Sequence, residues 1–148
     1  MKRLKAWLPA LAWMGVIFLM SAMPGETSGE QSGRILRLVT GLVAFLFGEQ
    51  AAAGIDLDML HLLIRKAAHM AEYAVLFMLY RRALRLEDAG RPGLWALMLC
   101  ACYAATDEFH QSFTEGRGPS AMDVGIDTLG AAAAWVLTKL ISQIKKER

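Results

Sequence analysis

The sequence predicts an all-α, polytopic membrane protein with about four transmembrane helices and one amphipathic helix lying at the membrane interface. Three observations support this fold class: 55% of the residues are hydrophobic, only 20% are charged, and several apolar runs approach the length of a membrane span. At 148 residues, the chain has the size of one domain covering residues 1–148. The net charge of +2 is small and no nucleic-acid motif occurs, so nucleic acid is not an expected partner.

The first transmembrane helix is predicted over residues 6–23 and ends at the strong breaker pair Pro24-Gly25. This run would be roughly 27 Å long as a helix, and it exceeds the apolar region of about 7–15 residues that is typical of a signal peptide. The residues before Pro24 also form a poor cleavage site. We therefore expect an uncleaved first span.

Between the first and second spans, the sequence predicts two loops and one short helix. Residues 25–33 are polar and rich in glycine and serine, and residues 49–58 are also predicted as loop. Residues 34–48 are too short to cross a bilayer comfortably and begin with two arginines. An amphipathic helix in the interface fits this segment better than a crossing.

Three further spans are predicted over residues 61–84, 94–113 and 120–141. A basic connection, residues 81–91, leads into Pro92-Gly93 and the third span. A glycine-rich turn, residues 115–119, joins the third and fourth spans.

The distribution of lysine and arginine predicts that both termini are cytoplasmic, because cytoplasmic flanks carry an excess of these residues. With the N-terminus inside, 11 of the 16 basic residues lie on the inner side. They are Lys2, Arg3, Lys5, Arg81, Arg82, Arg85, Arg91, Lys139, Lys145, Lys146 and Arg148.

The acidic residues show the opposite distribution. Only Glu87, Asp88 and Glu147 fall inside, which leaves 11 of the 14 acidic residues outside, together with all three histidines. Polar residues thus gather at the outer ends of the last three spans. Ionisable groups are expensive within a membrane helix, about 2.5–3.5 kcal/mol each at its centre, so we expect them to have a function.

Helical periodicity groups these residues into three faces. The candidates for catalytic roles are His69, Glu72, Asp107, Asp123 and Asp127. The candidates for ligand binding are Arg65, Lys66, Tyr73, Glu108, His110, Gln111 and Arg117.

Three interpretations of this set remain open. One is a structural ion-pair network that holds the outer ends of the helices together. A second is a metal site, for which His69, Glu72, Asp107 and His110 are the candidate ligands and Zn²⁺ or Mn²⁺ would activate water. The spacing permits a divalent metal without requiring one, and no HExxH motif occurs.

The third interpretation is an anion-binding cleft. Arg65, Lys66 and Arg117 would hold a phosphate or carboxylate, while acidic neighbours orient these cations. A histidine in the same cleft would serve as general acid or base. The anion would come from a lipid headgroup or a lipid-linked cell-wall precursor.

Several sequence pieces resemble the VanZ-like family of small bacterial membrane proteins. They are Ser21-x-x-Pro24-Gly25, Lys66-x-x-His69-x-x-Glu72-Tyr73, Asp107-Glu108-Phe109-His110-Gln111-Ser112-Phe113, Gly116-Arg117 and Asp123-x-x-x-Asp127-Thr128-Leu129-Gly130. The resemblance covers most of the chain and implies a multi-pass protein of the bacterial inner membrane. For the founding member it also implies a link to lowered sensitivity to the glycopeptide teicoplanin.

The sequence leads to one favoured function and two alternatives. The favoured function is an outward-facing polar cleft that binds an anionic envelope component, with membrane lipid as its surroundings and a link to teicoplanin resistance. One alternative is a metal- or acid/base-dependent hydrolase or transferase acting on lipid headgroups. The other is a structural or partner-binding membrane protein.

Overall fold

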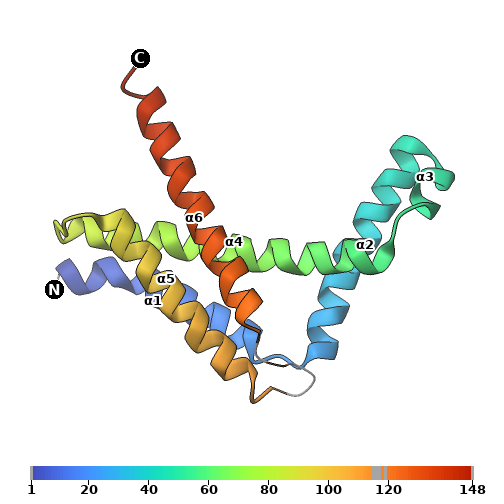
Figure 1. The fold of residues 1–148 in the computed structure, drawn as a ribbon, viewed down its shortest axis with the longest axis horizontal. Helices are drawn as coiled ribbons and strands as arrows, with labels where there is room; N and C mark the ends of the chain where they lie inside the picture. The colour runs from blue at the N-terminus through green and yellow to red at the C-terminus, as the bar shows by residue number, and fades with distance from the viewer. Residues whose placement is uncertain (1, 115–117, 119, 148) are drawn as a thin grey trace.

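A computed structural model of the chain describes residues 2–114, 118 and 120–147. All regular elements within these residues are helices, which confirms the all-α class. They are α1 (Lys2–Ser21), α2 (Gly25–Phe47), α3 (Glu49–Ala53), α4 (Leu57–Leu86), α5 (Pro92–Gln111) and α6 (Ala121–Ile144), as Figure 1 shows.

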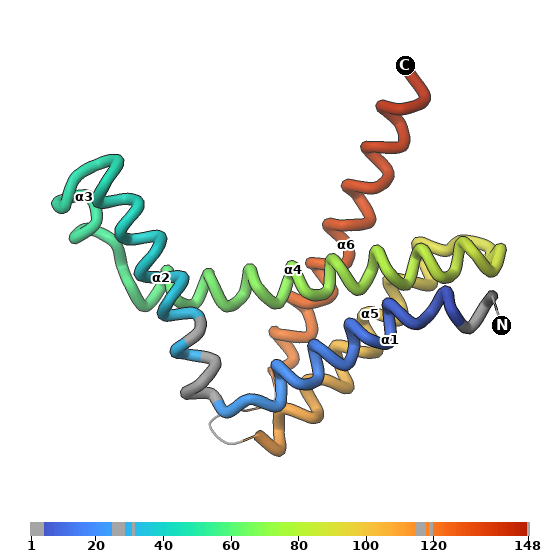
Figure 2. Tube along the Cα trace, turned by 180° about the vertical axis from the view of Figure 1, so that it is seen from behind, coloured from blue at the N-terminus to red at the C-terminus, as the bar shows by residue number. Residues whose placement is uncertain are grey.

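Helices α1, α4 and α5 lie side by side, and α6 crosses α4 (Figure 1). The C-terminal half of α6 projects away from the other helices, as the reverse view in Figure 2 also shows. Helix α2 crosses the first part of α4 and, with α3, extends beyond it. The arrangement is therefore open, and the core is confined to the region where α1, α4, α5 and α6 meet.

The connections predicted before α4 are helical in the structure, contrary to the expectation of two loops. Helix α2 begins at Gly25, so residues 25–33 form its first turns, and α3 occupies half of the predicted loop over residues 49–58. One tertiary contact joins the first of these segments to α4. Ser32 is buried, and its Oγ lies 2.5 Å from Nε2 of His61 on α4. Local composition gave no sign of this partner.

A helix occupies each of the four predicted spans, but the helices differ in their ability to cross a membrane. Among the described residues, only α6 is long and apolar enough to do so by length and composition, and the apolar segment Lys5–Ser21 is shorter. Helix α4 is long, at 30 residues, but Glu72 lies midway between the Arg65-Lys66 and Arg81-Arg82 pairs. A four-span topology therefore stays a prediction.

The core is built around one face of α4. Tyr73, Leu76 and Phe77 are completely buried there, against small residues of α5 and α6 such as Cys100 and Ala131. Small residues at helix contacts allow the backbones to approach closely. The core thereby fixes the positions of α1, α5 and α6 relative to α4.

Two glycines set the close approaches of α6. A Cβ at Gly130 would lie 2.7 Å from the Cα of Met70 on α4, so the two backbones touch at this crossing. A Cβ at Gly93 would lie 2.6 Å from Nε1 of Trp135, which packs α6 against the start of α5. Only glycine permits such contacts without displacement.

Candidate functional site

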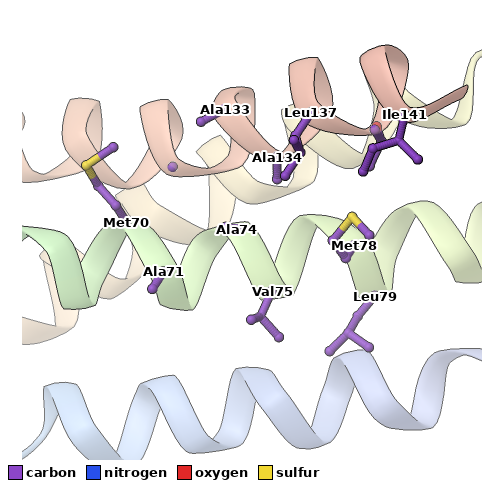
Figure 3. Close-up of a pocket in the computed structure, with 12 residues that line it drawn as sticks. Met70, Ala71, Ala74, Val75, Met78, Leu79, Ala133, Ala134, Leu137 and Ile141 are labelled. Atoms are coloured by element: carbon purple, nitrogen blue, oxygen red, sulfur yellow. The ribbon is translucent and has the colours of Figure 1, made fainter. Parts of the chain in front are cut away.

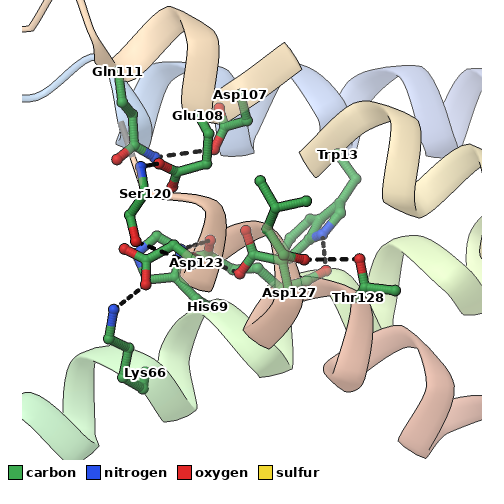
Figure 4. Close-up of polar contacts among 12 residues, drawn as sticks. Trp13, Lys66, His69, Asp107, Glu108, Gln111, Ser120, Asp123, Asp127 and Thr128 are labelled. Carbon is green, nitrogen blue, oxygen red and sulfur yellow. Dashed lines mark hydrogen bonds and ion pairs between the residues drawn. The ribbon is translucent and has the colours of Figure 1, made fainter. Parts of the chain in front are cut away.

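Polar side chains from α4, α5 and α6 meet near the first turn of α6 (Figure 4). Lys66 on α4 forms an ion pair with Asp123 on α6. Oε2 of Glu108 on α5 accepts a hydrogen bond from the backbone N–H of Ser120, with a donor–acceptor distance of 2.8 Å. The structure thus brings together residues from three segments whose charge patterns pointed to one end of the molecule.

Ser120 is the N-cap of α6, a role that the sequence patterns above did not assign. Its Oγ accepts a hydrogen bond of 3.3 Å from the backbone N–H of Asp123. The signal was present in the sequence, because a serine three residues before an acidic residue is typical of a helix start. The cap fixes the position of Asp123 and hence of its ion pair with Lys66.

The polar residues on α5 are buried. Asp107, Glu108 and Gln111 are at most 5% exposed. Nε2 of Gln111 donates a hydrogen bond of 3.1 Å to Oδ2 of Asp107. The second oxygens, Oδ1 of Asp107 and Oε1 of Glu108, accept no hydrogen bond within the described residues. These oxygens are acceptors that a bound cation or hydrogen-bond donor could use.

Asp127 on α6 is completely buried and faces His69 on α4. Its Oδ1 lies 3.7 Å from Nδ1 of His69, which is also 4.0 Å from Oε2 of Glu72. Neither oxygen of Asp127 accepts a hydrogen bond from the part of the chain that the structure describes. Because an unpaired buried carboxylate costs several kcal/mol, positive charge or a donor near Asp127 would stabilise it.

His110 does not point into this cluster. Its ring stacks on Phe18 of α1 with centroids 4.1 Å apart, and its Nδ1 lies 3.4 Å from Oγ of Ser21. Successive helical residues differ by about 100°, so His110 and Gln111 fall on opposite sides of Asp107. The expected shared face of Asp107, His110 and Gln111 therefore holds for Gln111 only.

Arg65 and His69 line a small cavity beside the cluster. Its volume is about 130 Å³, and Glu72 and Ser32 also contribute to its wall. No ion pair among the described residues involves Arg65, whereas Lys66 is engaged by Asp123. The volume would hold about four water molecules, or one anionic group of similar size.

Tyr73 belongs to the core rather than to the cavity wall. It is completely buried, and its ring packs against Tyr103 with centroids 6.3 Å apart. Its hydroxyl has no hydrogen-bond partner among the residues described. Trp13 of α1, which no sequence pattern singled out, donates a hydrogen bond of 2.9 Å to the backbone oxygen of Glu72 and closes this side of the site.

The metal-site interpretation finds little geometric support. Within residues 2–114, 118 and 120–147, no group of three or more His, Cys, Asp or Glu side chains is placed to hold a metal ion. His110 in particular faces α1 instead of the other candidate ligands. Arg117, a candidate anion ligand, lies outside the described residues.

The described cluster contains more acidic than basic groups. Its members are the carboxylates of Glu72, Asp107, Glu108, Asp123 and Asp127 and the basic side chains of Arg65, Lys66 and His69. Within this acidic cluster, the Arg65 side is the part that could receive an anion, because none of the ion pairs among the described residues involves Arg65. Nδ1 of His69 faces Asp127 at 3.7 Å, which is too long for a hydrogen bond.

The chain is similar to a known protein family over nearly its whole length. A family model described as VanZ/LLP1 matches residues 6–142. No curated protein and no solved structure matches the chain.

Proposed function

The chain belongs to the VanZ/LLP1 family, and we propose that it is a multi-pass protein of the bacterial inner membrane that binds an anionic component of the cell envelope. The binding pocket is the cavity lined by Arg65 and His69, in the N-terminal half of α4. The anionic group belongs to a lipid headgroup or a lipid-linked cell-wall precursor.

The membrane topology rests on three supports. Helix α6 is long and apolar enough to span a bilayer. Large apolar side chains are exposed on α1 and α2 as well, including Leu19, Leu38 and Phe45, and monomeric soluble proteins rarely expose so much apolar surface. The excess of basic residues at one end orients both termini toward the cytoplasm.

The single observation that carries the binding proposal is Arg65 at the cavity wall, with no carboxylate paired to it among the described residues. Lys66, which the sequence offered as an anion ligand together with Arg65 and Arg117, is paired with Asp123. Arg65 therefore replaces Lys66 as the principal anion contact. A planar guanidinium suits phosphate and carboxylate groups because it can donate two parallel hydrogen bonds.

Lipid titration of the purified protein in detergent tests this proposal. The substitution Arg65→Gln should weaken binding of the preferred anionic lipid about tenfold or more, since a hydrogen bond to a charged group is worth about 1.5–3 kcal/mol. Arg34→Gln is the matched control, because Arg34 is exposed on α2 and does not line the cavity. Equal binding by the two variants would refute the proposal.

The choice of titrant separates the two sources of the anion. Preference for an anionic phospholipid over a lipid-linked precursor favours a headgroup site, and the opposite preference favours cell-wall metabolism. In the second case, expression in a teicoplanin-susceptible host should raise the inhibitory concentration, and Arg65→Gln should abolish the rise. An unchanged inhibitory concentration would remove the link to resistance.

A second candidate function rests on His69 and Asp127. A histidine next to both a buried carboxylate and the cavity could act as general base on a bound headgroup. Incubation with the bound lipid should then release a hydrolysed or transferred headgroup, and His69→Gln should stop the reaction even at lipid concentrations that saturate the variant's pocket. Absence of any product from the unmodified protein would rule out this enzyme.

A further inference from the structure

An apolar groove runs between α4 and α6 (Figure 3). Its volume is about 530 Å³. Met70, Ala74 and Met78 line one side, and Ala134, Leu137 and Ile141 line the other. The helices touch at Gly130 and Met70 and then diverge toward their C-terminal ends, so the groove is the space between two separating helices (Figure 1).

The groove leads to a basic hollow. Met78 and Leu79 line both the groove and a second hollow of about 560 Å³, whose remaining wall consists of Arg81, Arg82, Arg85 and Leu86. Arg82 and Arg85 are exposed. None of the ion pairs found among the described residues involves these three arginines. The apolar groove thus ends beside a cluster of three arginines.

We propose that this composite site binds one anionic phospholipid, with an acyl chain in the groove and the phosphate against the arginines. From Met70 to Met78 the groove follows eight residues of helix, about 12 Å, which suits an extended hydrocarbon chain. Basic pockets between helices on the cytoplasmic side of a membrane are suited to anionic lipid headgroups. The helix of a second copy would fill the groove but would leave the arginines without a counter-charge.

The site is distinct from the pocket of the proposed function. Arg65 and Arg85 are 20 residues apart on the same helix, roughly 30 Å. The inference uses the proposed membrane location of the chain but not the outer anion pocket. In the predicted topology, the arginines lie on the cytoplasmic side, where they would meet lipid of the inner leaflet.

Native mass spectrometry of the full chain in detergent, titrated with phosphatidylglycerol and phosphatidylcholine, tests the headgroup contact. The double variant Arg82→Gln/Arg85→Gln should weaken phosphatidylglycerol binding about tenfold or more, because each arginine near an anionic surface contributes about a fivefold effect. The control Lys145→Gln/Lys146→Gln removes the same charge from the exposed C-terminal end and should change binding less than twofold. Equal losses in both variants would overturn the proposal.

A second pair of variants tests the acyl chain contact. Ala133 lines the groove, whereas Val136 is exposed on α6 and is not part of its wall. The substitution Ala133→Phe should block the groove and reduce phosphatidylglycerol binding about tenfold, while Val136→Phe should not. Unchanged phosphatidylglycerol binding by Ala133→Phe would refute the acyl chain site. The site would also be refuted if Ala133→Phe abolished a protein dimer and left lipid binding intact.

The outer pocket variant separates this inference from the proposed function. Arg65→Gln should retain phosphatidylglycerol at the α4–α6 groove. Complete loss of that lipid in Arg65→Gln, with no effect of Arg82→Gln/Arg85→Gln, would place the lipid at the outer end and overturn the inference.

Discussion

The polar side chains near the start of α6 differ in how many of their hydrogen-bonding atoms have partners. Lys66 and Asp123 form an ion pair, and their side chains are 28% and 25% exposed. Gln111 satisfies one oxygen of Asp107. Asp127 is the opposite case, since it is completely buried and neither oxygen accepts a hydrogen bond from the described residues. These differences make separate predictions for the two aspartates of α6.

The Lys66–Asp123 ion pair should contribute little to the free energy of unfolding. Solvent screens a pair with this exposure, so a double-mutant cycle with Lys66→Gln and Asp123→Asn should give a coupling free energy of about 0.5–1 kcal/mol. Unfolding of the four proteins by denaturant in detergent measures it. A coupling several times larger would mean that the pair is much less hydrated than the structure indicates.

The buried carboxylate of Asp127 should lower the free energy of unfolding. Asp127→Asn keeps the volume but removes a buried charge, so the free energy of unfolding should rise by about 1–3 kcal/mol. The control is Asp58→Asn, because Asp58 is exposed; since it lies in the first turn of α4, its substitution should lower the free energy of unfolding by about 0.3–1 kcal/mol and should not raise it. Destabilisation by Asp127→Asn would show instead that the carboxylate has a strong partner. A residue that lowers the free energy of unfolding, as Asp127 is expected to do, is typical of a functional site.

At the scale of elements, the crossing of α4 and α6 determines both candidate sites. It brings Asp123 and Asp127 next to Lys66 and His69, near the middle of α4, and opens the apolar groove beyond the contact. The crossing depends on Gly130, where a Cβ would overlap three backbone atoms of Met70. A backbone cannot give way as a flexible side chain can.

Gly130→Ala should therefore separate the two helices. We expect a loss of about 1–3 kcal/mol in the free energy of unfolding, the usual effect of overpacking. Gly125→Ala on the same helix has open space around its Cβ and should be neutral or should stabilise the helix by about 0.5–1 kcal/mol. Similar stabilities for the two variants would contradict the close crossing. In Gly130→Ala, the Lys66–Asp123 coupling should also fall.

At the scale of the whole molecule, the helices are arranged openly (Figure 2), and many large apolar side chains are exposed on α1, α2 and α6. Lipid is the surrounding that this surface suits. Polar residues gather near the start of α6, whereas Arg81, Arg82 and Arg85 lie near the end of α4. The middle of α4, from Arg65 to Glu72, and its C-terminal end thus carry different chemistry, which a defined orientation in the membrane would exploit.

Cysteine labelling in intact cells tests this orientation. In a variant with Cys100 and Cys102 replaced by alanine, Gly54→Cys should react with a membrane-impermeant thiol reagent, whereas Gly90→Cys should not. Both glycines are exposed and lie close to the two ends of α4, one before it and one after it. After cell lysis both should react. Reaction of Gly90→Cys alone in intact cells would invert the topology and move the polar pocket to the cytoplasm.

The sequence by itself determined the helical class, the family and the set of polar residues concentrated near one end. Hydropathy and helical period are local properties, so they locate helices and assign residues to approximate faces. The N-cap at Ser120 has a different local signal, a serine three residues before an acidic residue, whose value became evident only from the contact with Asp123.

Only the tertiary structure decided which partners those residues find. It paired Lys66 with Asp123, turned His110 toward Phe18, and continued α2 through a segment that composition marked as loop. A rotation of about 60° separates neighbouring faces of a helix, and contacts such as Ser32 with His61 join distant segments. Because packing selects both the rotation and the partner, a one-dimensional pattern leaves them open.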